Sequence, residues 1–262
     1  MPWADLKDLA LFYQAVGGGP AIVFVHGSSG NHLSWWQQVP MFQTRFRCVV
    51  FDQRGFGRTA AGSSGNDARY LVEDLRALLD HLELEQAILV GQSYGGIACM
   101  GMAVAYPERV RGLVMASSIG TIVAERLRTE LAAYRRTIAN DFAGRTYPPG
   151  LRLRRPDLAF LYDCISALNP PRGPFDERRL PFPATSDALA SWAIPTLFVA
   201  GGLDQITPAP IIRMAASRVG GASYSEVPQC GHSVYFEDAE RFNAILGEFL
   251  QAVDEHGRRP AT

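Results

Sequence analysis

The sequence predicts an α/β fold, in which a mostly parallel central sheet is flanked by helices. Two short unbroken apolar runs, residues 21–25 and 87–90, each lead into a glycine-containing turn, which is typical of strands buried on both faces. Between them, residues 67–82 place leucines at helical spacing on one side and charged residues on the other, which indicates an amphipathic helix. Because strands and helices alternate along the chain, we expect parallel pairing with helices on both faces.

The same two patterns predict the remaining elements. A glycine-rich loop is expected over residues 52–65 and a frayed tail over residues 258–262. Further strands are expected over residues 9–16, 46–51, 110–116, 194–199 and 223–227, and further helices over residues 31–42, at least in part, 97–106 and 236–253.

Composition excludes several classes of function. The chain has 262 residues, of which 47% are hydrophobic and 19% are charged, and its formal net charge is −1. Such a balance, without a long basic tract, argues against a nucleic-acid partner, and no apolar run reaches membrane-spanning length. Residues 1–11 lack the pattern of a signal peptide, and the four cysteines are scattered without a zinc-ligand spacing. We therefore expect a cytoplasmic protein with no metal site and no membrane partner.

Residues 86–96, which read QAILVGQSYGG, place a serine between a predicted strand and a predicted helix. Gly91 and Gly95 flank Ser93 at two residues on either side, so the chain can turn sharply and lift the serine off the strand end. The helix directs its first amide groups and the positive end of its dipole at the space above Ser93. We interpret Ser93 as a nucleophile; the alternative is a glycine-rich turn without a catalytic role.

A serine nucleophile needs a base, and the base needs an acid that orients it. Of the five histidines, His232 lies in a loop between a predicted strand and the last helix. Asp204 lies shortly after the strand over residues 194–199. Because parallel strands bring their carboxyl ends to one edge of the sheet, we predict that His232 is the base and Asp204 the acid.

Five segments carry a resemblance to a known family: His26-Gly27-Ser28-Ser29-Gly30, Asp52-Gln53-Arg54-Gly55-Phe56-Gly57, Gly91-Gln92-Ser93-Tyr94-Gly95-Gly96, Gly201-Gly202-Leu203-Asp204 and Gly231-His232. In this order, over nearly the whole chain, they resemble the α/β-hydrolase superfamily, and its serine-nucleophile carboxylesterases and enol-lactonases in particular. The resemblance implies the α/β-hydrolase fold and the order of nucleophile, acid and base seen here. It also implies that Asp52 and Arg54 brace a loop.

The oxyanion of an acyl-transfer intermediate needs two N–H donors. One is expected to be the amide of Tyr94, directly after the nucleophile. The resemblance implies that the other comes from the loop after residues 21–25, with Ser28 at the position that the family pattern favours and Ser29 as the alternative.

Residues 120–190 form a long interruption between two strands. The segment begins with a helical stretch, residues 121–142, and then becomes rich in proline and arginine. A loop of this length in a compact domain is usually a functional lid, and the resemblance implies a helical cap; the alternative is a surface embellishment. We therefore divide the chain into a core, residues 1–119 and 191–262, and a cap, residues 120–190. Candidate substrate-binding residues, each with a core role as its alternative, are Ser29, Trp35, Trp36, Phe160, Tyr162 and Val234.

The predicted function is hydrolysis of a small-molecule carboxylic ester or lactone through an acyl-enzyme on Ser93. No metal ion and no organic cofactor is expected, and the oligomeric state is left open. One alternative is hydrolysis of a carbon–carbon bond in a vinylogous diketone, since the same three residues support that chemistry. An alternative of another class is a ligand-binding protein or a cofactor-free oxygenase with the same fold.

Overall fold

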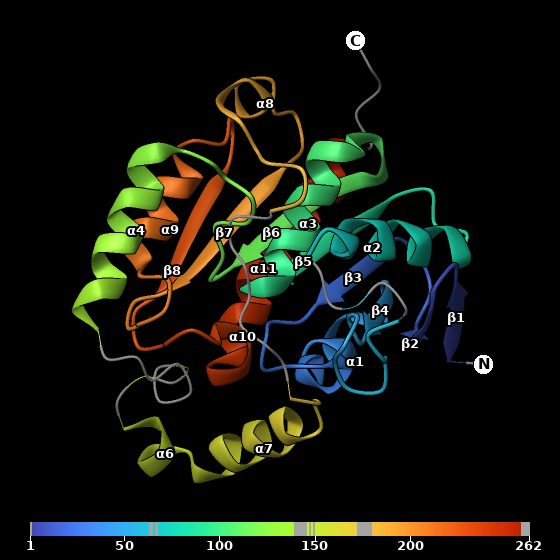
Figure 1. Cartoon of the computed structure of the whole chain (residues 1–262), viewed down its shortest axis with the longest axis horizontal. Helices are drawn as coiled ribbons and strands as arrows, with labels where there is room; N and C mark the ends of the chain where they lie inside the picture. The colour runs from blue at the N-terminus through green and yellow to red at the C-terminus, as the bar shows by residue number, and fades with distance from the viewer. Residues whose placement is uncertain are drawn as a thin grey trace.

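The computed structural model describes residues 2–62, 65, 68–138, 146, 148, 150–171 and 180–257. In these residues eight strands form one sheet in the order β1-β2-β4-β3-β5-β6-β7-β8 (Figure 1). The strands β1 and β2 pair antiparallel with each other and β2 with β4, and all other neighbours are parallel. The predicted fold class is confirmed. The strands are β1 Trp3–Leu6, β2 Leu9–Val16, β3 Ala21–Val25, β4 Arg47–Phe51, β5 Ala87–Gln92, β6 Val110–Ala116, β7 Thr196–Gly201 and β8 Ser223–Val227.

Helices cover both faces of this sheet. One hydrophobic cluster joins the sheet to α2, α3 and α9, and a second joins it to α10 and α11 (Figure 1). The helices are η1 His32–Trp35, α1 Val39–Phe42, α2 Tyr70–His81, α3 Tyr94–Ala105, η2 Pro107–Arg109, α4 Glu125–Thr137, α6 Leu151–Arg154, α7 Pro156–Ala167, α8 Ser186–Ala190, α9 Ala209–Ala216, α10 Val234–Glu237 and α11 Ala239–Gly257, where η marks a 3-10 helix. Among the helices of the described ranges, none combines the length and the apolar character that crossing a membrane requires.

The unbroken apolar runs are explained by burial on both faces. In β3, Ile22 and Phe24 point into the cluster with α11, whereas Val23 and Val25 point into the cluster with α3. Successive side chains of a strand face opposite sides, so a strand between two helical layers needs apolar residues at every position. This is why β3 and β5 could be predicted from a few residues each.

Several elements differ from the sequence prediction. The helix expected over residues 31–42 is broken into η1 and α1, because Asn31 caps only the first turn and Pro40 has no N–H to donate. The helix expected over residues 236–253 is two helices, α10 and α11, which meet at the non-helical Asp238. The short strand β1 and the helix α9 were not predicted at all.

The two ends of the segment of residues 120–190 lie side by side. Ile122 and Ala184 form a parallel bridge, and the amide of Ala184 donates to the carbonyl oxygen of Thr121 at 2.9 Å. Between these points, α4 joins the cluster that contains α9, whereas α7 joins the cluster that contains α11. In Figure 1, α6 and α7 accordingly lie well apart from α4. Residues 139–142 of the expected helical stretch, and the expected tail over residues 258–262, lie outside the described residues.

Candidate active site

Ser93 occupies a strained turn between β5 and α3. Its backbone φ is 50° and its ψ is −113°, a left-handed conformation that is costly for a residue with a side chain. A Cβ atom on Gly95 would lie 2.2 Å from the carbonyl oxygen of Val25, so only glycine lets α3 approach β3 this closely. The Gly-x-Ser-x-Gly spacing is therefore required by the local packing, and it leaves the Ser93 side chain half-buried at the end of the strand.

His232 lies between Ser93 and Asp204. Its Nε2 atom is 2.8 Å from Oγ of Ser93, and its Nδ1 atom is 2.8 Å from Oδ2 of Asp204. The other carboxylate oxygen of Asp204 accepts the amides of Ile206 at 2.8 Å and Thr207 at 2.9 Å. A carboxylate on Nδ1 fixes the proton there and leaves Nε2 free to accept the serine proton. The structure thus brings the three predicted residues into one hydrogen-bonded chain.

This geometry can perform acyl transfer. The hydroxyl of Ser93 becomes nucleophilic as its proton moves to His232, and Asp204 stabilises the resulting imidazolium. Both Asp204 and His232 are buried, so water competes little for their mutual hydrogen bond, and charge interactions there are stronger than in solvent.

Two side chains that the sequence did not identify hold the loop of His232. Gln92 donates from Nε2 to the carbonyl oxygen of His232 at 3.0 Å. The carboxylate of Glu237 accepts the amides of Gly231 at 2.7 Å and Ser233 at 3.0 Å, one on each side of His232. Burial raises the pKa of Glu237 to about 7, although the two amides act in the opposite direction. No sequence pattern signals these contacts, because they depend on how the loop folds back onto α10.

A cavity of about 510 Å³ opens beside Ser93, a volume typical of small-molecule sites. Ser28 and Tyr94, the two predicted oxyanion donors, line it together with the nucleophile, whereas Ser29 does not. The remaining wall comes from α3, the segment after β6, α4, the segment before α8 and the loop after β7. Its residues are Ile97, Ser117, Ser118, Ile119, Gly120, Ile122, Arg128, Thr129, Leu131, Ala132, Arg135, Leu180, Ile206 and Thr207.

The predicted substrate-binding residues do not line this cavity. Trp35 is fully buried and packs against Phe24 and Tyr235, with ring centroids 5.1 and 4.3 Å apart, so it is a core residue. Phe160 is 72% exposed on α7. The others are Ser29, the partly exposed Trp36 and the buried Tyr162 and Val234. Tyr162 packs edge-on against Phe236, 5.2 Å between centroids.

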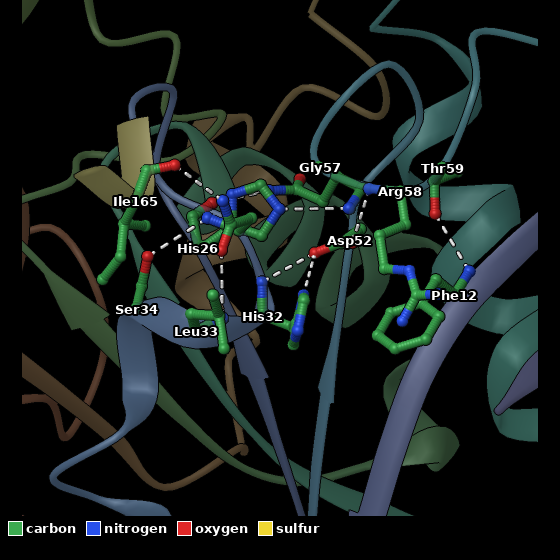
Figure 2. Close-up of polar contacts among 12 residues, drawn as sticks. Phe12, His26, His32, Leu33, Ser34, Asp52, Gly57, Arg58, Thr59 and Ile165 are labelled. Atoms are coloured by element: carbon green, nitrogen blue, oxygen red, sulfur yellow. Dashed lines mark hydrogen bonds and ion pairs between the residues drawn. The ribbon is translucent and has the colours of Figure 1, made fainter. Parts of the chain in front are cut away.

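The Asp52 loop forms a hydrogen-bonded network of its own (Figure 2). One oxygen of Asp52 accepts both the amide and Nδ1 of His32 at 2.7 Å, and the other accepts the amide of Arg58 at 2.8 Å. Burial acts to raise the pKa of Asp52, but these hydrogen bonds together hold that pKa below its usual range. Arg54 pairs with the buried Asp74 at 2.7 Å. Both residues of the motif therefore hold the loop in place.

Within the described ranges, no group of three His, Cys, Asp or Glu side chains has an arrangement that could hold a metal ion.

The fold and the site define the chain as a member of the α/β-hydrolase family, and residues 20–239 match the family described as alpha/beta hydrolase fold. The chain is accordingly an enzyme of the hydrolase class. Among similar proteins, a 2-hydroxymuconate semialdehyde hydrolase of Pseudomonas sp. strain CF600 is 30% identical over 91% of this chain and 89% of its own. The 3-oxoadipate enol-lactonase 2 of Acinetobacter baylyi is 26% identical over 90% of this chain and 91% of its own. A thermophilic esterase from Thermogutta terrifontis, 21% identical over 94% of each chain, shares the fold with a TM-score of 0.75.

Proposed function

We propose that the protein is a serine hydrolase that cleaves a small carboxylic ester or lactone through an acyl-enzyme. Ser93 attacks the carbonyl carbon, His232 takes the serine proton and passes it to the leaving alcohol, and Asp204 orients His232. Water then attacks the acyl-enzyme with His232 as base, which releases the acid and restores Ser93. The observation that carries the proposal is the continuous chain from Asp204 through His232 to Ser93 at the wall of a cavity.

The amides of Tyr94 and Ser28 are proposed to hold the oxyanion. Both residues line the cavity beside Ser93. Ser29 does not line it, which favours Ser28 as the second donor. The amide of Gly30 donates to the carbonyl oxygen of Gly27 at 3.0 Å, so Ser28 and Ser29 form the tip of a tight turn whose shape is fixed before substrate binds.

Residues 120–190 are proposed to act as a cap. Support comes from α4, whose residues Arg128, Leu131 and Arg135 form part of the cavity wall. A second candidate reaction, hydrolysis of a carbon–carbon bond, is favoured by the 30% identity to a semialdehyde hydrolase. The two reactions share the proposed nucleophile and base, and they differ in the substrate that the cavity accepts.

A fluorophosphonate probe and short p-nitrophenyl esters test this proposal. The wild-type protein should be labelled and should release p-nitrophenol, whereas Ser93→Ala should do neither. Ser217→Ala, on the exposed end of α9, is the matched control and should behave as the wild type. Labelling that persists in Ser93→Ala would contradict the proposed nucleophile. Turnover of a vinylogous diketone without turnover of any ester would instead favour the second candidate.

A further inference from the structure

We infer that the substrate carries an anionic group, such as a carboxylate, and that Arg128 on α4 binds it inside the cavity. The inference rests on the function proposed above and specifies its substrate class. It starts from the charge of the cavity wall, which includes Arg128 and Arg135 and, among the described residues, no Asp or Glu.

The orientation of α4 is fixed by its packing. Leu127 is fully buried and Leu131 is 6% exposed, and both join the core cluster that contains α9. Arg128, Leu131 and Arg135 are spaced three and four residues apart, which places them on one face of a helix. Both arginines therefore lie next to the anchored Leu131 on the cavity wall, and both are also exposed to solvent.

Arg128 has no ion pair and no side-chain hydrogen bond with any other described residue. The neighbouring Arg126, by contrast, is paired with Glu130 at 2.9 Å and does not line the cavity. An arginine that has no partner among the described residues and lines the same cavity as Ser93 can offer its paired N–H groups to a carboxylate in a two-point contact.

The rest of the wall fits a substrate that is apolar between its two ends. Ile97, Ile119 and Ile122 lie in the same cavity as Ser93 and α4, together with Leu180 and Ile206. A molecule with its scissile carbonyl at Ser93 would therefore place a hydrocarbon segment against these side chains. Its far end would meet Arg128, where a charge is favoured and a methyl group gains nothing.

Two matched ester series test the inference. In the first, p-nitrophenyl monoesters of dicarboxylic acids with four to eight carbons are compared with p-nitrophenyl esters that end in a methyl group. In the second, butyrate esters of ω-hydroxy acids are compared with butyrate esters of simple alcohols, which moves the charge to the alcohol side. A phosphonate-terminated ester in each series shows which anion is preferred.

The wild type should prefer the anionic ester of at least one series in kcat/KM, with an optimum at one chain length. Arg128→Gln should reduce that preference, the ratio of kcat/KM for the anionic ester to kcat/KM for its neutral partner, by about 10-fold or more, the effect of one charge-assisted contact. Arg128→Lys should retain part of it, and Arg126→Gln should retain all of it. Added salt should weaken the preference of the wild type.

The outcomes separate this inference from the proposed function. Turnover of neutral esters with no anionic preference in either series would overturn the inference and leave the hydrolase intact. If no ester is turned over, the proposed function is contradicted. The inference is then tested by measuring the binding of an anionic ester. Calorimetry on Ser93→Ala should show monomethyl adipate binding that is lost on adding Arg128→Gln. Equal binding with and without Arg128 would overturn the inference.

Discussion

Replacing Glu237 by glutamine should remove a loss of stability that the wild type undergoes as the pH rises through the titration of this buried carboxyl group. Burial raises the pKa of Glu237 from an ordinary value of 4.5 to about 7. A raised pKa means that the folded protein holds this proton more tightly than the unfolded chain does, so stability falls as the pH rises through this range. Glutamine has no proton to lose, but its single acceptor oxygen can keep only one of the two amide hydrogen bonds. The variant should therefore be less stable than the wild type at acid pH, and this deficit should shrink or reverse as the pH rises.

The magnitude follows from the difference of about 2.5 pH units between the two pKa values. At about 1.4 kcal/mol per unit, ionisation of Glu237 costs about 3 kcal/mol of folding free energy, and the cost is complete above pH 7. The charged groups around this carboxylate are Asp204, which raises its pKa, and His232, which lowers it. The hydrogen bonds to Gly231 and Ser233 are already part of this balance.

Urea denaturation at pH 5, 6, 7 and 8, followed by circular dichroism, measures the effect. The free energy of unfolding of Glu237→Gln should rise relative to that of the wild type by roughly 2–3 kcal/mol between pH 5 and pH 8. Glu240→Gln replaces an exposed carboxylate three residues away and should stay within about 0.5 kcal/mol of the wild type throughout. The reasoning would be refuted if the difference in unfolding free energy between Glu237→Gln and the wild type stayed constant with pH, or changed in favour of the wild type as the pH rises.

Three further substitutions test other parts of the structure. Ser28→Pro removes the proposed oxyanion N–H at a turn position that suits proline, so kcat should fall ~10²–10³-fold with little change in KM; a fall below tenfold in steady-state assays would indicate another donor. Gly95→Ala places a methyl group against the carbonyl oxygen of Val25 and should cost about 1–3 kcal/mol in urea denaturation, and a wild-type midpoint would contradict that close approach. Arg54→Met leaves the buried Asp74 unpaired and should cost ~3–5 kcal/mol; thermal melts that match the wild type would show that the ion pair is dispensable.

The parallel part of the sheet could be predicted because burial on both faces leaves a clear mark on the sequence. β3 is apolar throughout and β5 over its first four residues, and runs this short that are bounded by turn residues are typical of buried strands. The meeting of Ser93, Asp204 and His232 followed from a second rule, that parallel strands end at one edge. Neither rule applies to β1, in which only one of four residues is buried, so its pattern does not differ from that of a loop.

The cavity wall could not be predicted, because it depends on contacts between segments far apart in the chain. Trp35 precedes Trp36 in a predicted helix, and only the rotation of η1 decides that Trp35 enters the core. Arg128 lies in the predicted helical stretch of residues 121–142, and the role proposed for it depends on how Leu131 anchors α4. A helical pattern identifies which residues share a face, but the partner of that face is known only from the fold.

The strained residues of the protein show what the nucleophile turn depends on. Ser93 and Ser117 both have a φ of 50°, and they lie at the ends of the adjacent strands β5 and β6, on the wall of the same cavity. Such conformations cost about 1–3 kcal/mol each, and they persist only where surrounding contacts hold them. The amide of Ser93 donates to the carbonyl oxygen of Ala116 at 2.9 Å, and the carbonyl oxygen of Ser93 accepts the hydroxyl of Ser118 at 2.7 Å. Two hydrogen bonds of about 1 kcal/mol each can offset the strain. The glycines give the turn the space that it needs, and the hydrogen bonds to the end of β6 stabilise it.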